Sequence, residues 1–141
     1  MTESSSSVPT GVSYHEINNP DYFIVTTTRG FRLHKWNGSV LVKSCDEIPG
    51  GLLLCQPYKN SQIFFVVGTG KNPDFPSNKL CLWDDIEKKV VSDLEFYQPI
   101  IDLKINEGWV VVALADKALL FNFESDEGMN AQRAEIPSII K

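Results

Sequence analysis

Short apolar runs, rich in β-branched and aromatic residues, alternate with Gly, Pro, Asn and Asp along the chain from residue 12 onward. No window shows apolar residues at the i, i+3, i+4 and i+7 spacing of an amphipathic helix over three turns. Short runs bounded by turn residues are typical of β-strands. The pattern therefore predicts an all-β protein with strands at residues 22–27, 31–36, 39–43, 52–56, 62–67, 79–83, 89–94, 100–105, 109–114 and 118–123.

Polar segments between these runs predict hairpin turns. Asn37-Gly38 lies between two predicted strands, and both residue types tolerate the positive φ of a two-residue hairpin turn. The polar residues 84–89 and the pair Glu107-Gly108 also separate apolar runs. We expect antiparallel hairpins at these places, the first closed by a tight two-residue turn.

One strand pattern recurs three times. Each copy ends near an aromatic residue, at Trp36, Trp83 and Phe123, and follows a more hydrophobic strand that we expect to be buried on both faces. The copies are about 40 to 47 residues apart, and Trp83-Asp84 is a literal Trp-Asp pair. This period and this pair are typical of WD-type β-propeller blades, which are antiparallel four-stranded sheets.

The repeat predicts a disordered, serine-rich N-terminal tail at residues 1–11 and three blades at residues 12–45, 46–96 and 97–141. Closed propellers have about four to eight blades, so three blades form an incomplete propeller with two open sides. Either the chain is the N-terminal part of a longer propeller, or it assembles with other blades. We favour the first alternative.

Composition and charge exclude some classes of function. The 141 residues carry 13 Lys and Arg against 18 Asp and Glu, a net charge of −5 without a basic cluster, which argues against a nucleic-acid partner. The acidic N-terminus is unlike a signal peptide, and no apolar run is long enough to cross a bilayer. We expect a cytoplasmic protein whose membrane contact, if any, is peripheral.

The candidate reactive side chains form no catalytic or metal-binding pattern. Cys45, Cys55 and Cys81 match neither zinc-ligand spacing nor a disulfide framework, so we expect reduced, partly buried thiols. His15 and His34 have no Cys, Ser or carboxylate at the spacing of a catalytic triad or metal site.

The acidic turn after Trp83 has two interpretations. Asp84, Asp85 and Glu87 carry the oxygen ligands of a divalent cation site, but carboxylates in a tight turn more often accept hydrogen bonds from the backbone. We favour turn capping and expect no metal.

The stretch around Gly70-Lys71 is similar to a phosphate-binding loop only at first sight. Phe65 stands where the first glycine of that motif is required, Asn72 stands in place of Ser or Thr, and prolines prevent the helix that must follow. We therefore expect no nucleotide, no cofactor and no enzymatic activity.

The connection at residues 70–78 is longer than the other turns, contains two prolines and places Phe75 between polar neighbours. We expect Phe75 to be exposed. Ordered loops on rigid scaffolds often recognise partners, although a solvated spacer is the alternative interpretation.

The stretch from Asn72 to Asp85, NPDFPSNKLCLWDD, resembles the PROPPINs, which are seven-bladed WD-type propellers that bind phosphoinositides in autophagy and endolysosomal traffic. The resemblance covers roughly residues 12–125 and is weak in the first blade. It implies a non-enzymatic peripheral membrane scaffold that binds phosphatidylinositol 3-phosphate and the 3,5-bisphosphate. It also implies a location on autophagosome-precursor, endosomal or vacuolar membranes.

The lipid-binding motif of that family, Phe-Arg-Arg-Gly, is absent from this sequence. Thr28-Arg29-Gly30-Phe31 has a single arginine and lies in the first blade, so it lacks the paired phosphate contacts of the motif. We therefore expect phosphoinositide binding to reside on blades that this chain does not contain.

The resemblance does place a protein-binding surface within this chain. In the family, loops of the first and second blades contact a lipid-transfer partner in autophagy. The matching positions here are Asn18, Asn19, Asn72, Pro73, Asp74, Phe75, Pro76, Ser77, Asn78 and Lys79. The alternative hypothesis is a lipid-independent interaction fragment that keeps only these partner-binding loops.

Overall fold

The computed structural model describes residues 8–15, 19–58, 61–123 and 132–137. The described elements are β1 (Pro9–His15), β2 (Asn19–Thr27), β3 (Gly30–Lys35), the 3-10 turn η2 (Asn37–Ser39), β4 (Leu41–Cys45), β5 (Leu52–Pro57), β6 (Ile63–Gly68), β7 (Lys79–Asp84), β8 (Lys89–Glu95), β9 (Asp102–Asn106), β10 (Trp109–Ala113), β11 (Lys117–Asn122) and β12 (Gln132–Pro137). None of these elements is a helix long enough to cross a membrane.

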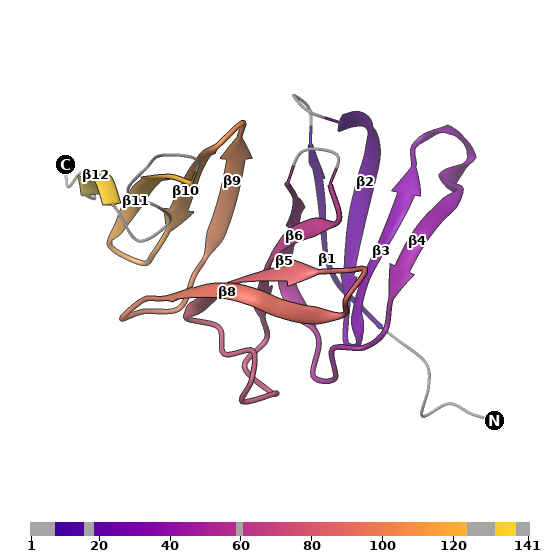
Figure 1. The fold of residues 1–141 in the computed structure, drawn as a ribbon, viewed down its shortest axis with the longest axis horizontal. Coiled ribbons are helices and arrows are strands. Elements are labelled where there is room, and N and C mark those ends of the chain that lie inside the picture. Colours follow the sequence, from indigo (N-terminus) through magenta and orange to yellow (C-terminus); the bar gives the residue numbers. More distant parts are fainter. Residues whose placement is uncertain (1–7, 16–18, 59–60, 124–131, 138–141) are drawn as a thin grey trace.

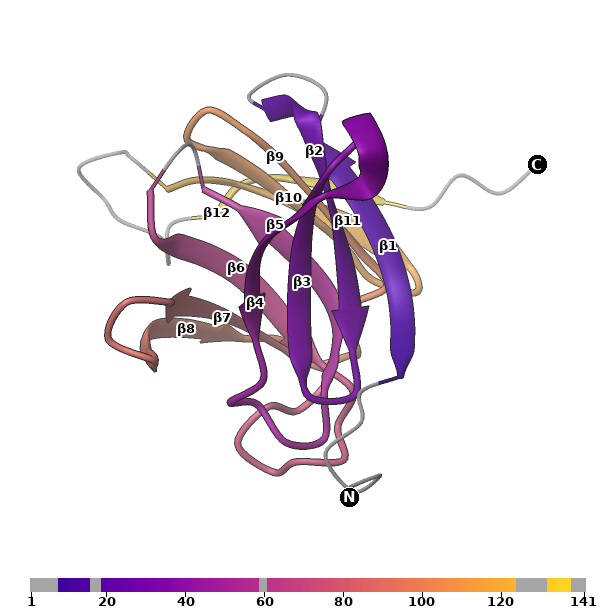
Figure 2. The ribbon, with the colours of Figure 1, turned by 90° about the vertical axis from the view of Figure 1, so that its right-hand side faces the viewer.

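The strands form three four-stranded antiparallel sheets, each with its strands in chain order. We call β1–β4 the first blade, β5–β8 the second and β9–β12 the third. The second blade lies between the other two, and the three sheets fan out around one side of the molecule (Figures 1 and 2). The predicted all-β class and the four-stranded propeller blades are confirmed.

The middle blade is buried on both faces, because successive side chains of a strand point to opposite sides. In β6, Phe64 and Val66 pack in a cluster with residues of the first blade. Phe65 and Val67 pack in a second cluster with residues of the third blade. The unbroken apolar run of β6 therefore fills both blade interfaces.

The prediction that the corresponding strands of the outer blades are also buried on both faces is wrong. In β2, Ile24 is buried, whereas Phe23 and Val25 are half-buried. In β10, Val110 is buried, whereas Val111 is half-buried. The difference arises because each outer blade has a neighbouring blade on one side only among the described residues.

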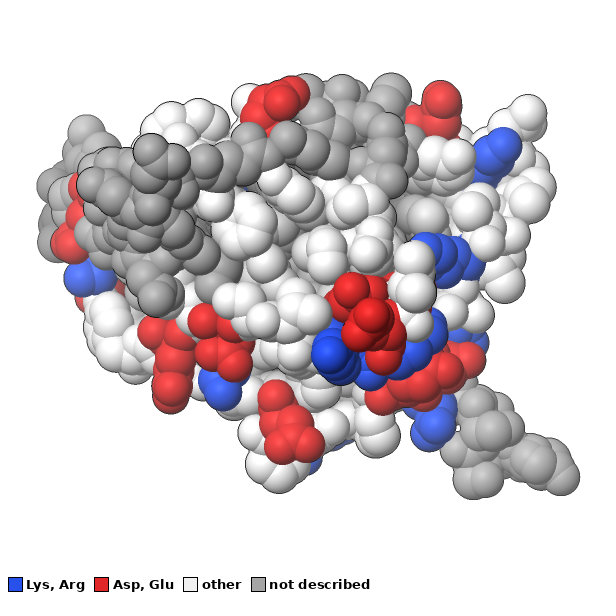
Figure 3. Space-filling model, viewed as in Figure 1, with Lys and Arg blue, Asp and Glu red and all other residues white. Residues whose placement is uncertain are grey.

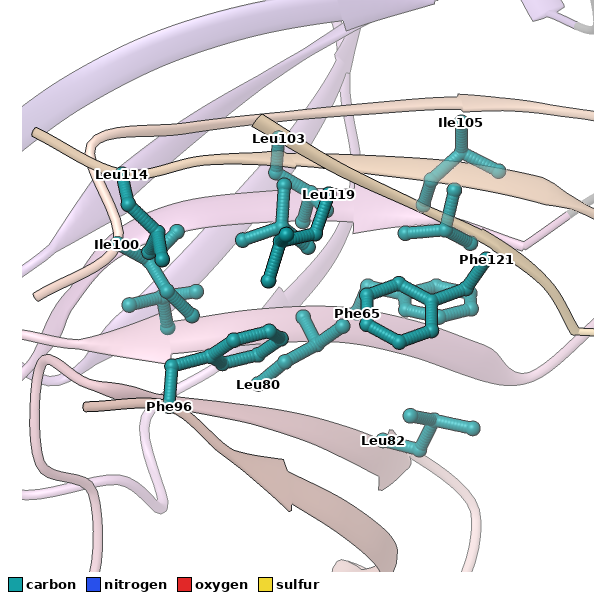
Figure 4. Packing of buried hydrophobic residues seen from close by; sticks show 13 residues of the cluster. Phe65, Leu80, Leu82, Phe96, Ile100, Leu103, Ile105, Leu114, Leu119 and Phe121 are labelled. Atoms are coloured by element: carbon teal, nitrogen blue, oxygen red, sulfur yellow. The ribbon is translucent and has the colours of Figure 1, made fainter. Parts of the chain in front are cut away.

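The larger cluster fills the interface between the second and third blades (Figure 4). Aromatic rings contribute to it by edge-to-face packing, as between Phe96 and Phe121 at 5.9 Å between ring centroids. Its buried members are Phe65, Val67, Leu80, Leu82, Phe96, Ile100, Leu103, Ile105, Val110, Val112, Leu114, Leu119 and Phe121.

Two strands, β1 and β12, were not predicted, because their sequences lack a clear apolar alternation. β1 begins at Pro9 and pairs with β2, and β12 pairs with β11. The predicted disordered tail, residues 1–11, is therefore wrong at residues 9–11, which belong to β1. Residues 1–7 lie outside the described residues, so the rest of the tail stays a prediction, as do the blade boundaries.

The prediction of a two-residue turn at Asn37-Gly38 is wrong. β3 ends at Lys35 and β4 begins at Leu41, and the 3-10 turn η2 lies between them, with Gly38 at a φ of 75°. The backbone N–H of Lys35 closes this longer turn by donating to the carbonyl oxygen of Val40 at 2.9 Å. Gly38 thus supplies the expected positive φ inside a wider connection.

Candidate functional site

The β6–β7 loop (residues 69–78) lies at the lower end of the second blade (Figure 1). It leaves β6 through Gly68, where a Cβ atom would lie 2.0 Å from the carbonyl oxygen of Phe75. Gly70 follows with a φ of 92°, a conformation that residues with side chains rarely adopt. These two glycines let the chain fold back closely over Phe75.

Hydrogen bonds within the loop fix its shape. The backbone N–H of Phe75 donates to the carbonyl oxygen of Asn72 at 2.8 Å, and that of Gly70 donates to the carbonyl oxygen of Phe75 at 3.3 Å. The side-chain Oδ1 of Asn72 accepts from the backbone N–H of Asp74 at 3.0 Å, which is an Asx-turn. These hydrogen bonds within the loop therefore stabilise its folded shape.

The loop is fastened to the segment between the first and second blades, residues 46–51. The side chain of Asn72 donates from Nδ2 to the carbonyl oxygen of Pro49 at 2.9 Å. The hydroxyl of Thr69 donates to the carbonyl oxygen of Gly50 at 2.6 Å, and its backbone N–H donates to that of Gly51 at 3.2 Å. The loop and this segment therefore form one continuous surface.

The other end of the loop is fastened to the connection between the second and third blades. Asn78 and Phe96 form a reciprocal pair: the backbone N–H of Phe96 donates to the carbonyl oxygen of Asn78, and Nδ2 of Asn78 donates to the carbonyl oxygen of Phe96, both at 2.8 Å. The backbone N–H of Ile100 donates to the carbonyl oxygen of Ser77 at 2.8 Å. The loop is thus held by both neighbouring connections.

The prediction that Phe75 is exposed is wrong. Its side chain is 7% exposed, and its ring centroid lies 6.2 Å from that of Trp83 in the cluster between the first and second blades. Burying the phenyl ring removes apolar surface from water and holds the loop down, so the residue anchors the loop internally. It does not offer an apolar contact to a partner.

The remaining predicted residues divide by exposure. Pro73 and Asp74 are exposed at the tip of the loop. The half-buried members are Asn72, Pro76, Ser77, Asn78 and Lys79. Lys71 is also exposed, beside Pro73 and Asp74, although it was not among the residues predicted from the sequence. Its charge next to Gly70 was the available signal, but it was considered only as part of a phosphate-binding loop.

Asn18 lies outside the described residues. The backbone of Asn19 begins β2, but its side chain is also outside the described part of the structure. The structure therefore brings together the second-blade residues of the predicted surface, and the first-blade residues stay a prediction.

The acidic turn after Trp83 caps its own backbone, as favoured from the sequence. Oδ1 of Asp84 accepts hydrogen bonds from the backbone N–H groups of Ile86 at 2.9 Å and Glu87 at 3.0 Å. The bond from Glu87 is the main cause of a lowered pKa for the Asp84 carboxyl. No group of three His, Cys, Asp or Glu side chains suited to a metal ion occurs within the described ranges.

The three cysteines are free and buried. Burial raises the pKa of Cys45 to about 12 and that of Cys81 to about 11, and it raises the pKa of Cys55 as well. Protonated, buried thiols are poor nucleophiles and poor metal ligands. The predicted free thiols are confirmed, and their burial is more complete than expected.

His34 packs against an aromatic neighbour. Its ring stacks on Phe23 with centroids 5.3 Å apart. The side chain of His15 lies outside the described part of the structure.

Comparisons with known proteins match both the sequence and the fold, although no family model matches the chain. SVP1-like protein 2 of Pichia angusta is 35% identical over 111 residues, which are 78% of this chain and 31% of that protein. Autophagy-related protein 18e of Arabidopsis thaliana is 30% identical over 106 residues, which are 73% of this chain and 28% of that protein. The chain therefore spans about three tenths of the length of these relatives.

Solved structures agree at the level of the fold. Hsv2 of Kluyveromyces marxianus superposes with a TM-score of 0.74 at 17% identity, covering 94% of this chain and 40% of the other. KlAtg21, solved in complex with the coiled coil of AgAtg16, superposes with a TM-score of 0.66 over 92% of this chain and 40% of the other. The resemblance to the PROPPIN family is therefore confirmed: the chain is a homologue of SVP1-like proteins, and its three blades match part of the propeller of Hsv2.

Proposed function

We propose that this chain contributes the partner-binding part of a PROPPIN-like scaffold that acts in autophagy. The scaffold is a non-enzymatic, cytoplasmic protein that attaches peripherally to autophagosome-precursor, endosomal or vacuolar membranes. It binds phosphatidylinositol 3-phosphate or the 3,5-bisphosphate through blades outside this chain, because the Phe-Arg-Arg-Gly motif is absent here. The similarity to SVP1-like protein 2 and Autophagy-related protein 18e supports this assignment.

The observation that supports this proposal is that the β6–β7 loop is hydrogen-bonded to both neighbouring connections. Hydrogen bonds from Asn72 and Asn78 to both neighbouring connections hold the loop in place before any partner arrives. A preorganised loop loses little conformational entropy on binding, and its tip presents Lys71, Pro73 and Asp74 to solvent. We therefore expect a partner to contact the charged side chains of Lys71 and Asp74. Phe75 is buried and does not contribute an apolar contact.

An exchange of charges at the loop tip tests this role. The double variant Lys71→Glu with Asp74→Lys keeps the net charge but inverts the pattern offered to the partner. The matched control, Glu87→Lys with Lys89→Glu, inverts an exposed ion pair whose Nζ and Oε1 atoms are 3.3 Å apart on the β7–β8 turn. We expect the loop variant to recover severalfold less of the autophagy lipid-transfer partner in pull-downs and the control to recover the same amount as the unaltered chain. Equal recovery of the partner by both variants would show that the loop tip does not contribute to partner binding.

The alternative function is a lipid-independent interaction fragment that competes with a longer protein for the same partner. Flotation with vesicles containing phosphatidylinositol 3-phosphate separates the two. The scaffold requires the endogenous protein to float with the vesicles, whereas the competing fragment binds the partner and stays at the bottom of the gradient.

A further inference from the structure

The turn between β3 and β4 contains the pair Asn37-Gly38, and no other asparagine in the sequence precedes a glycine. The turn lies at the upper end of the first blade (Figure 1), where Figure 3 shows largely uncharged surface with basic side chains beside it. Asparagine is a labile residue, because the backbone nitrogen of the next residue can attack its side-chain amide. Glycine leaves that nitrogen unshielded, since it has no Cβ atom. This pair is therefore chemically suited to deamidation.

The structure leaves the amide of Asn37 accessible. Asn37 and Gly38 are both exposed, and no hydrogen bond joins the Asn37 side chain to the described part of the chain. A Cβ atom built on Gly38 would have Cγ2 of Val40 as its nearest atom outside the adjacent residues, at 3.7 Å, so there is room beside the glycine. η2 spans only three residues, and Gly38 departs from helical geometry with a φ of 75°. Short 3-10 turns have weak hydrogen-bond geometry, so this one restrains the backbone less than a strand does.

The other asparagines whose side chains the structure describes are protected in different ways. Asn78 donates from Nδ2 to a backbone carbonyl oxygen at 2.8 Å, which holds its amide. Asn72 precedes a proline, whose nitrogen carries no hydrogen to lose. Asn122 is half-buried, and the exposed Asn106 is followed by Glu107, which carries a side chain. Exposure, a free amide and a following glycine therefore coincide at a single described asparagine.

We propose that Asn37 is a site of spontaneous deamidation in the folded protein, with isoaspartate among the products. The backbone nitrogen of Gly38 loses its proton to solvent and bonds to Cγ of Asn37, while the Cγ–Nδ2 bond breaks and the amide nitrogen takes up a proton and leaves as ammonia. Water then opens the succinimide ring that has formed. Opening at Cγ gives aspartate, and opening at the main-chain carbonyl carbon gives isoaspartate. The reaction consumes water and needs no oxidant, reductant or enzyme.

Isoaspartate changes the length of the turn. Its main chain runs through Cγ, which inserts an extra carbon between positions 37 and 38. This carbon falls inside the turn that the backbone N–H of Lys35 closes by donating to the carbonyl oxygen of Val40 at 2.9 Å. Trp36, within the same turn, packs on Phe23 with 4.6 Å between ring centroids. We therefore expect isoaspartate to loosen the turn and this aromatic packing, whereas aspartate adds a charge without lengthening the chain.

The test incubates the native 141-residue chain in buffer at physiological temperature and follows each asparagine by peptide mapping and mass spectrometry. Conversion of the amide to an acid raises the peptide mass, and an isoaspartyl methyltransferase with labelled S-adenosylmethionine detects isoaspartate. We expect both signals at Asn37 and severalfold less conversion at Asn78 and Asn106. Equal conversion at the three sites, or conversion at Asn37 only after denaturation, would overturn the proposal.

Exchanges at the following residue test the role of the glycine. Gly38→Ala should slow the conversion of Asn37 severalfold, because the added Cβ shields the backbone nitrogen. Glu107→Gly should give Asn106 the same neighbour, and the backbone there accepts glycine because Glu107 already has a φ of 58°. We expect Asn106 to deamidate in this variant severalfold faster than in the unaltered chain. Failure of either expectation would contradict the assignment.

The variant Asn37→Asp separates the added charge from the altered main chain. We expect the amide chemical shifts of residues 35–41, measured on ¹⁵N-labelled protein, to move further in the isoaspartate-containing chain than in Asn37→Asp. The β6–β7 loop lies at the opposite end of the molecule (Figure 1), so its shifts should stay constant in both and the proposal does not depend on its function. Identical shifts of the turn in the two proteins would overturn the effect proposed for isoaspartate.

Discussion

The indole Nε1 of Trp83 donates a 3.0 Å hydrogen bond to Oδ1 of Asp85, and both side chains are buried. The same carboxylate accepts a hydrogen bond from Nζ of Lys88 at 2.8 Å and faces Nζ of Lys43 on β4 at 3.6 Å. One aspartate therefore joins the end of β7, the following turn and the outer strand of the first blade.

Removal of this carboxylate should destabilise the protein. Asp85→Ala leaves the buried indole N–H without its partner and two lysines without their shared anion, so we expect the free energy of unfolding to fall by about 2 kcal/mol. The control Glu87→Ala removes an exposed ion pair and should change it by less than about 0.5 kcal/mol. Urea unfolding followed by tryptophan fluorescence gives both values. Equal stability of the two variants would contradict the role assigned to Asp85.

Asp84 should make stability depend on pH in the acid range. The backbone N–H of Glu87 lowers the pKa of the folded Asp84 carboxyl, so the ionised form is favoured in the folded state. This contribution is fully present above the pKa of the unfolded chain and is lost as the pH falls through the lower, folded pKa. Asp84→Asn should therefore lose less stability than the unaltered chain between about pH 5 and pH 3. Urea unfolding at several pH values gives the free energy of unfolding of both proteins. If the two values fell in parallel with pH, the contribution assigned to Asp84 would be contradicted.

The glycine at position 68 should be intolerant of any side chain. The added Cβ of Gly68→Ala would lie 2.0 Å from the carbonyl oxygen of Phe75, so the β6–β7 loop must shift, and we expect a loss of at least about 2 kcal/mol. Gly38→Ala is the control, because its Cβ has 3.7 Å to the nearest side-chain atom and only its φ of 75° is unfavourable, at about 1 kcal/mol. A thermal unfolding midpoint lowered more by the control than by Gly68→Ala would contradict the fit described for the loop.

The thiols should be unreactive in the folded protein. Burial raises the pKa of Cys45 and Cys81 to about 12 and about 11, so both are protonated at neutral pH and shielded from reagents. We expect an aromatic disulfide reagent to label none of the three cysteines rapidly in the native state and all three in denaturant. Rapid labelling of a thiol in the native protein would show that a blade interface opens.

Much of this fold could be predicted from the sequence, because apolar runs bounded by turn residues specify strands locally. The repeat around Trp36 and Trp83 identified the blades, and the apolar run of β6 correctly indicated two buried faces. The same rule failed for β2 and β10, because burial of a face depends on whether a neighbouring blade covers it. Whether another blade covers a face depends on how the sheets assemble, so it cannot be predicted from the sequence of a single strand.

The candidate site was harder to predict than the fold. The β6–β7 loop was located correctly by its length and prolines, but Phe75 looked exposed because its sequence neighbours are polar. Its burial depends on the turn made by Gly68 and Gly70 and on Trp83, which follows later in the chain. Lys71 was overlooked as a surface residue for a related reason, since only the folded loop shows which side chains reach solvent.

The mass of the endogenous polypeptide tests the central claim, that this chain is part of a longer PROPPIN-like propeller, most directly. An antibody against the exposed loop tip around Asp74, used for immunoblotting and then for top-down mass spectrometry, would report it. The chain has a mass of 15.8 kDa and spans 31% of SVP1-like protein 2, so we predict an endogenous protein of about three times that mass. An endogenous polypeptide of 15.8 kDa would contradict the claim and would favour a lipid-independent interaction fragment.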